Sequence, residues 1–129
     1  MVTGLWVNLS ETLRWVFLVR SYWVEHYETM NLVYPETPIN GLVWMVWGFL
    51  IAVTIFALST KFDLFKTVFL TWFVVFVMGW LVLWNMDTLP SGILVFVVPL
   101  SLLEIYIGAL ISTKLSVALR TVPPQSAAA

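Results

Sequence analysis

Three long stretches with almost no charge decide what this chain can fold into. They cover residues 37–60, 67–86 and 88–113, and the only charged residue within them is Glu104. A helix needs about 20 apolar residues to cross a bilayer, whereas a membrane-spanning strand needs about half as many and alternates in polarity. The stretches therefore predict three membrane-spanning helices, at about 39–60, 65–86 and 90–114.

Composition favours the same class of protein. Hydrophobic residues make up 61% of the 129 positions and charged residues 10%, against roughly 25% charged residues in soluble domains. Such a chain cannot cover itself with a water-compatible surface, so the lipid bilayer is its expected partner. A formal charge of −1 and the lack of a basic tract argue against nucleic acid as a partner. We predict an all-α integral membrane protein with a single transmembrane domain at 1–120.

The N-terminal segment, about 5–27, is apolar but carries Glu11, Arg14 and Arg20. Each charge at mid-membrane costs about 2.5–3.5 kcal/mol, so the segment inserts poorly on its own. Two arrangements fit the pattern. The helix spans the membrane with Glu11 and Arg14 paired, which gives a bundle of four, or it lies flat on the outer interface beside three spans. Spanning is favoured because aromatic residues near both ends of the segment lie about one bilayer thickness apart.

Charged residues in the turns predict the orientation in the membrane. The turn with Lys61 and Lys66 lies on the same side as the basic residues that follow the last span, whereas Asp87 lies in the opposite turn. Because cytoplasmic loops carry an excess of Lys and Arg, the Lys61–Lys66 turn and the C-terminus are predicted to be cytoplasmic. Residues 121–129 are predicted to form a disordered tail.

A buried carboxyl is the first candidate for a functional group. Glu104 lies near the centre of the last span, where an ionisable residue is costly and is a functional candidate by default. Ser101, Gly108 and Ser112 share its helix face. Glu104, with Ser101 and Arg14, is therefore a candidate proton or cation site. The alternative is a structural role, in which Glu104 forms inter-helix hydrogen bonds or a salt bridge to Arg14.

Small residues at four-residue spacing predict where helices pack closely. Gly108 and Ser112 in the last span have this spacing, as do Gly48 and Ala52 in the first predicted span. The second span has no comparable pair and is predicted to face lipid with its large aromatic residues: Trp72, Phe73, Phe76 and Trp80.

Metal and cofactor chemistry finds little support in the sequence. Glu25, His26 and Glu28 are weak metal candidates, because the chain has one histidine and no cysteine and His26 points about 100° away from Glu25 on a helix. Nucleophilic triads, phosphate-binding loops and dinucleotide fingerprints are absent from the sequence. We expect no cofactor and no enzymatic activity.

These observations lead to two functional hypotheses. The first is a non-enzymatic membrane subunit that acts by lateral helix packing in a homo-oligomer or a larger membrane complex. The alternative is a minimal transporter or channel that uses Glu104 to bind a proton or cation. A weaker third reading, a lipid or pigment binder, rests on the eight tryptophans, for which an aromatic belt at the membrane surface is a sufficient explanation.

Overall fold

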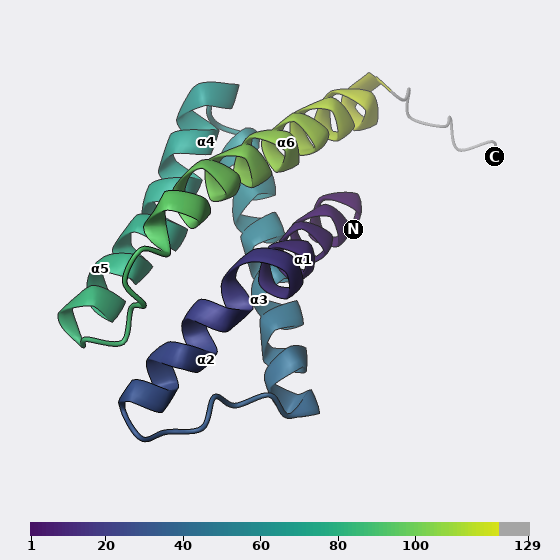
Figure 1. Ribbon diagram of the computed structural model, residues 1–129. Coiled ribbons are helices and arrows are strands. Elements are labelled where there is room, and N and C mark those ends of the chain that lie inside the picture. The colour runs from purple at the N-terminus through teal and green to yellow at the C-terminus, as the bar shows by residue number, and fades with distance from the viewer. Residues whose placement is uncertain (122–129) are drawn as a thin grey trace.

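The structure is a computed structural model that describes the backbone of residues 1–121 and the side chains of residues 1–117. Within that range the chain contains helices, turns and no strand (Figure 1). The predicted disordered tail lies outside the described residues, apart from Thr121 at its start. The elements in chain order are α1 (Val2–Arg14), η1 (Trp15–Val19), α2 (Arg20–Thr29), α3 (Pro38–Ser59), α4 (Leu64–Trp72), η2 (Phe73–Val77), α5 (Met78–Asn85) and α6 (Leu94–Thr121).

Three helical stretches are long and apolar enough to cross a membrane. They are Pro38–Ser59, Leu64–Asn85 and Leu94–Val117, of which the second joins α4, η2 and α5 into one helix. Consecutive stretches run in opposite directions and are joined by short turns (Figure 1). The chain is therefore an all-α integral membrane protein, as its sequence predicts.

Local sequence signals account for most of the helix ends. Pro38 opens α3, where its missing N–H removes no helical hydrogen bond. Asp63 caps α4, because its side chain accepts a hydrogen bond from the Lys66 backbone N–H at 3.0 Å. The last helix begins at Leu94 rather than at residue 90. Gly92 has a positive φ of 79°, which is incompatible with a helix, so the chain is still turning at that point.

The N-terminal helix packs most closely against the bundle through its first half. α1 packs against α3 and α6 and buries a face that includes Thr3, Gly4, Val7 and Arg14. The π-helical turn η1 follows, with Val19 at φ −112° and ψ −12°, and α2 then runs in a different direction (Figure 1). α2 buries none of its residues. The segment predicted as one helix at about 5–27 is therefore helical but changes direction after Arg14.

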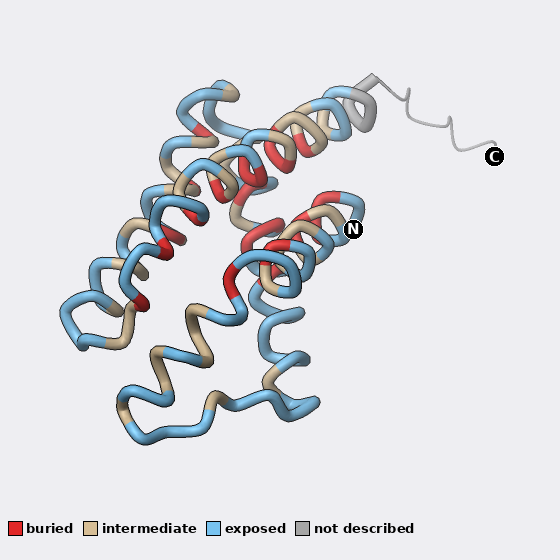
Figure 2. The backbone as a smooth tube through the Cα atoms, in the orientation of Figure 1, coloured by how far each residue is buried: buried red, intermediate tan, exposed pale blue. Residues whose placement is uncertain are grey.

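Buried apolar residues form two clusters of unequal size, and Figure 2 shows how the buried positions are distributed along the helices. The main core lies toward the Lys61–Lys66 end of the bundle and consists of Val7, Ile51, Ile55, Phe76, Ile105 and Ala109. A small cluster of Val19, Ile93 and Val97 lies toward the other end, which we call the 30–37 end after the loop found there. The N-terminal α1 contributes to the main core, whereas α2 has no buried residue to add to either group.

Candidate functional site

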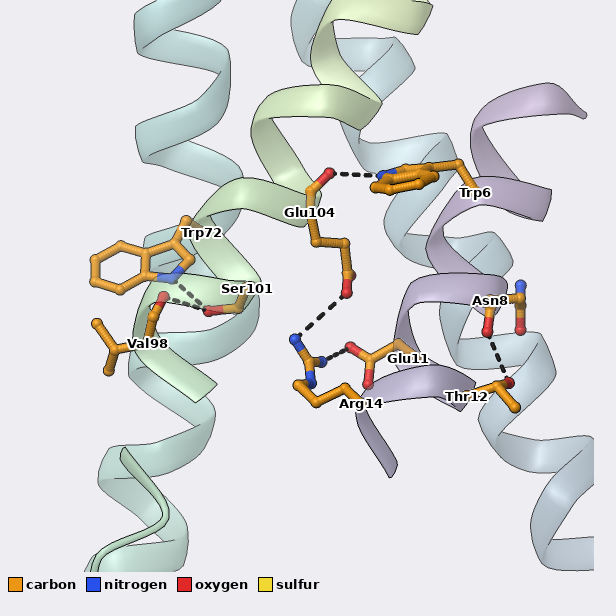
Figure 3. A network of polar contacts seen from close by, with 9 residues as sticks. All are labelled: Trp6, Asn8, Glu11, Thr12, Arg14, Trp72, Val98, Ser101 and Glu104. Atoms are coloured by element: carbon orange, nitrogen blue, oxygen red, sulfur yellow. Dashed lines mark hydrogen bonds and ion pairs between the residues drawn. The ribbon is translucent and has the colours of Figure 1, made fainter. Parts of the chain in front are cut away.

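The polar centre of the bundle joins α1 to α6. The Glu104 side chain, from α6, is 0% exposed, and its Oε2 lies 3.4 Å from Arg14 Nη1. Arg14, the last residue of α1, is 7% exposed, and its Nη2 donates a hydrogen bond to Glu11 Oε1 one turn earlier. Figure 3 shows the three side chains pointing toward one another between the two helices. The sequence-predicted pairing of Arg14 with Glu104, and of Glu11 with Arg14, is thus present in the structure.

This centre holds two carboxylates and one guanidinium. With all three groups ionised, one negative charge is in excess in a region where burial makes an unpaired charge costly. Neither carboxylate oxygen of Glu104 has a hydrogen-bond partner among the described residues. The guanidinium carbon of Arg14 lies over the Phe76 ring, 5.7 Å from its centroid. One bound proton or one monovalent cation would balance the charge of this centre.

Hydrogen bonds from indole groups fix α6 on either side of this centre. The Trp6 indole N–H donates to the Glu104 backbone carbonyl at 3.0 Å. One turn earlier, the Trp72 indole N–H donates to Ser101 Oγ at 2.9 Å, and the Ser101 hydroxyl donates to the Val98 carbonyl at 3.0 Å. Ser101 shares a helix face with Glu104, but its hydroxyl ties α4 to α6 and does not bond the carboxylate (Figure 3).

The predicted packing residues meet other helices of the same chain. A Cβ atom at Gly108 would lie 3.0 Å from Ile55 Cδ1, and the Ser112 and Thr3 hydroxyls are 2.9 Å apart. A Cβ at Gly48 would lie 2.7 Å from Asn8 Nδ2, and Ala52 is buried. These close approaches bring α1 against α3 and α6. The faces on which small residues predict close helix packing are therefore occupied by helices of the same chain.

The weak metal candidates do not converge. His26 Nε2 forms a hydrogen bond with the Asp87 backbone carbonyl at 2.9 Å, which ties α2 to the turn before α6. Glu25 and Glu28 are exposed. In residues 1–121 no three His, Cys, Asp or Glu side chains gather closely enough to hold a metal ion.

A cavity of about 980 Å³ toward the 30–37 end is the feature that sequence reasoning missed. Its lining includes five of the eight tryptophans: Trp15, Trp23, Trp44, Trp47 and Trp80. Four charged side chains also line it: Glu11, Arg14, Arg20 and Glu36. The abundance of tryptophan was visible in the sequence, but nothing there indicated that the rings surround a space.

The outer part of this cavity is held by ion pairing and ring contacts. Arg20 donates two hydrogen bonds of 2.8 Å to the Glu36 carboxylate, which hold the pKa of Glu36 below its usual range. The Tyr34 ring lies 5.0 Å from the rings of both Trp15 and Tyr27, measured between centroids. Burial raises the pKa of the Tyr34 phenol. These contacts fasten the loop before α3 to η1 and α2.

Comparisons with protein-family models, curated proteins and solved structures gave no match. What the site can do is therefore argued from its own geometry.

Proposed function

We propose that this chain is a non-enzymatic membrane subunit that acts by lateral helix packing in a homo-oligomer or a larger membrane complex. The observation that carries the proposal is the contrast between its interior and its outward surface. The buried charges are engaged with one another inside the bundle, whereas only 17% of the most apolar part of Leu64–Asn85 is buried within the chain. What remains available to other molecules is mainly an apolar helix surface within the membrane.

The surface of α4, η2 and α5 is the best candidate for such lateral contact. Its outward residues are large and apolar, and all are more than 40% exposed: Phe69, Phe73, Val74, Met78, Leu81 and Val82. Lipid covers such a surface without specificity, whereas a second copy or another membrane helix covers it by shape. The turns at both ends are short, so a soluble partner finds little surface outside the membrane among residues 1–121.

Cross-linking in the membrane tests this proposal. The chain lacks cysteine, so a single cysteine at Val74 or Leu81 is unambiguous. We expect either cysteine to form disulfide-linked dimers or cross-links to a partner in native membranes. A cysteine at Val53, which is 63% exposed on α3, serves as the matched control. Equal and weak cross-linking at all three positions, with a monomer in nanodiscs, would contradict a lateral role.

The proposal includes the orientation predicted from the charges. We place the Lys61–Lys66 turn and the C-terminus in the cytoplasm, with all four helical stretches across the membrane. Cysteines at Asp63 and Thr88 should then react with an impermeant reagent from opposite sides. A tag before Val2 should be protected in intact cells. A tag accessible from outside would place the N-terminal helix on the outer surface instead.

A minimal transporter or channel that uses Glu104 is the second candidate. It is favoured by the excess negative charge beside Arg14 and by the cavity that reaches Glu11 and Arg14. Full burial of Glu104 speaks against it, since an ion would need the helices to part. In proteoliposomes we expect no pH-dependent flux. Flux that disappears in Glu104→Gln but persists in the exposed control Glu25→Gln would favour the transporter.

A further inference from the structure

We propose that the aromatic cavity at the 30–37 end binds a lipophilic organic cation, whose charge lies toward Glu11 and whose apolar body lies among the tryptophans. This inference goes beyond the lateral role proposed above and does not depend on it. It rests on the size of the cavity, the kind of side chains that line it and the balance of charge at its inner end.

The cavity has the dimensions and lining of a ligand site. Its volume of about 980 Å³ lies at the upper end of the range of roughly 300–1,000 Å³ that is typical for small-molecule sites. Glycines as well as aromatic residues shape this space. Gly41 and Gly79 lie on its wall, and a Cβ added at either glycine would meet no atom within 4 Å. Two helices thus present bare backbone to the same space.

Charge within the cavity favours a cation over an anion. Arg20 is fully engaged by Glu36 in a two-bonded pair, so this pair is neutral. At the inner end Arg14 is shared between Glu11 and Glu104, which leaves one negative charge in excess when all three are ionised. Glu11 lines the cavity and is 24% exposed, and Figure 3 shows it beside Arg14 at the edge of α1. No arginine of the cavity is left without a carboxylate partner.

The tryptophans strengthen the same preference. Tryptophan is the best of the aromatic side chains at attracting a cation to its ring face, and the attraction grows when the site excludes water. Trp15, Trp44 and Trp80 come from three different stretches, so rings face the space from several sides. A site for a lipid acyl chain needs only aliphatic side chains and gains nothing specific from tryptophan. Indole rings beside a centre in which two carboxylates share one guanidinium suit an organic cation.

The test uses the full chain in nanodiscs and a pair of probes of nearly identical shape and opposite charge. Tetraphenylphosphonium is the cation and tetraphenylborate is the anion, and equilibrium dialysis measures the binding of each. We expect saturable binding of the cation, with binding of the anion at least about tenfold weaker. Equal binding of the two probes would overturn the proposal in favour of an apolar pocket that does not distinguish charge.

One variant tests where the cation binds, and a second tests whether the carboxylate attracts it. Gly79→Leu adds a side chain on the cavity wall, where a Cβ meets no atom, and should abolish binding of the cation, while Val95→Leu, on the outside of α6, should leave it unchanged. Glu11→Gln removes the excess charge and should weaken binding about tenfold or more, whereas the exposed Glu25→Gln should not. Binding of the cation that persists in Gly79→Leu, or that is unchanged in Glu11→Gln, would overturn the assignment. So would a phospholipid that co-purifies with the chain and is not displaced by the cation.

Discussion

The two ends of the bundle are built from side chains of different size, and they differ in how closely their helices approach. At the middle of α3 and toward the Lys61–Lys66 end, Gly48 and Gly108 allow α1 to lie directly against α3 and α6. Toward the 30–37 end, tryptophans and tyrosines surround a cavity of about 980 Å³, and α2 buries no residue. Small residues let backbones meet, whereas at the other end large rings line an open space between the helices.

Arg14 lies at the boundary between these two regions, and its removal should have the largest effect. Arg14→Met leaves Glu104 buried without a cationic partner, which in buried pairs costs about 3–5 kcal/mol. We expect the free energy of unfolding, measured in mixed detergent micelles, to fall by an amount in that range. The double variant Arg14→Met with Glu104→Met should be more stable than Arg14→Met alone. Costs that simply add would mean that the two side chains are not coupled.

A pair of glycine variants tests the contrast between the two ends directly. Gly108→Leu forces a large side chain against Ile55, Thr3 and Trp6, and such overpacking typically costs about 1–3 kcal/mol. Gly79→Leu adds the same side chain where a Cβ meets nothing, so its cost should be within about 0.5 kcal/mol. Thermal unfolding in nanodiscs would compare them. Similar losses at both positions would show that the cavity end is as tightly packed as the main core.

Replacement of Glu104 by glutamine should have a smaller effect than either change. Glu104→Gln keeps a polar side chain of similar volume and leaves Arg14 neutralised by Glu11. Polar contacts between membrane helices contribute about 0.6 kcal/mol on average, and we expect a loss of stability of that order. Glu104→Ala is the comparison, since it also removes the packed side chain and should cost more. A large loss in the glutamine variant would show that the charge itself holds α1 to α6.

The smallest expected effect concerns the exposed pair at the cavity mouth. Arg20 lowers the pKa of Glu36, so the pair stabilises the fold above the ordinary carboxyl pKa near 4.5 and this contribution is lost as pH falls through the lowered value. A spin label at Val33, in the loop before α3, should become more mobile as the pH falls through that lowered value. In Glu36→Gln the label should be mobile at every pH. If the mobility of the label in the native chain does not change with pH, the Arg20–Glu36 pair does not hold the loop in place.

The membrane spans could be predicted from the sequence because length and lack of charge are properties of each stretch alone. The pairing of Arg14 with Glu104 was foreseen as one alternative, since both charges needed a partner. The prediction that the second span turns its aromatics to lipid was wrong in part. Phe73 is exposed, but Phe76 is buried in the main core, and Trp72 and Trp80 pack against it.

The bend after Arg14 and the cavity could not be predicted, because they depend on helical turns that carry no sequence signal. η1 and η2 each hold a wider, π-helical turn without proline or glycine, and such a turn changes which face the following residues present. The segment predicted as one helix at about 5–27 therefore bends after Arg14. The cavity is lined by residues of that bend and by Gly41 and Gly79, which come from two different helices.

The long separation of Arg14 from Glu104 along the chain has a consequence for biosynthesis. A ribosome completes α1 first and α6 last, so Arg14 has only Glu11 as a partner while the intervening helices are made. Charged residues make insertion of a helix costly even when they are paired, and Arg14 gains its second carboxylate only when α6 is made. We therefore expect α1, although synthesised first, to settle into the bundle last. Chains arrested before residue 94 and after residue 121 allow the test. A protease should cut an N-terminal tag at different rates in the two chains, and identical protection would mean that α1 inserts without waiting for α6.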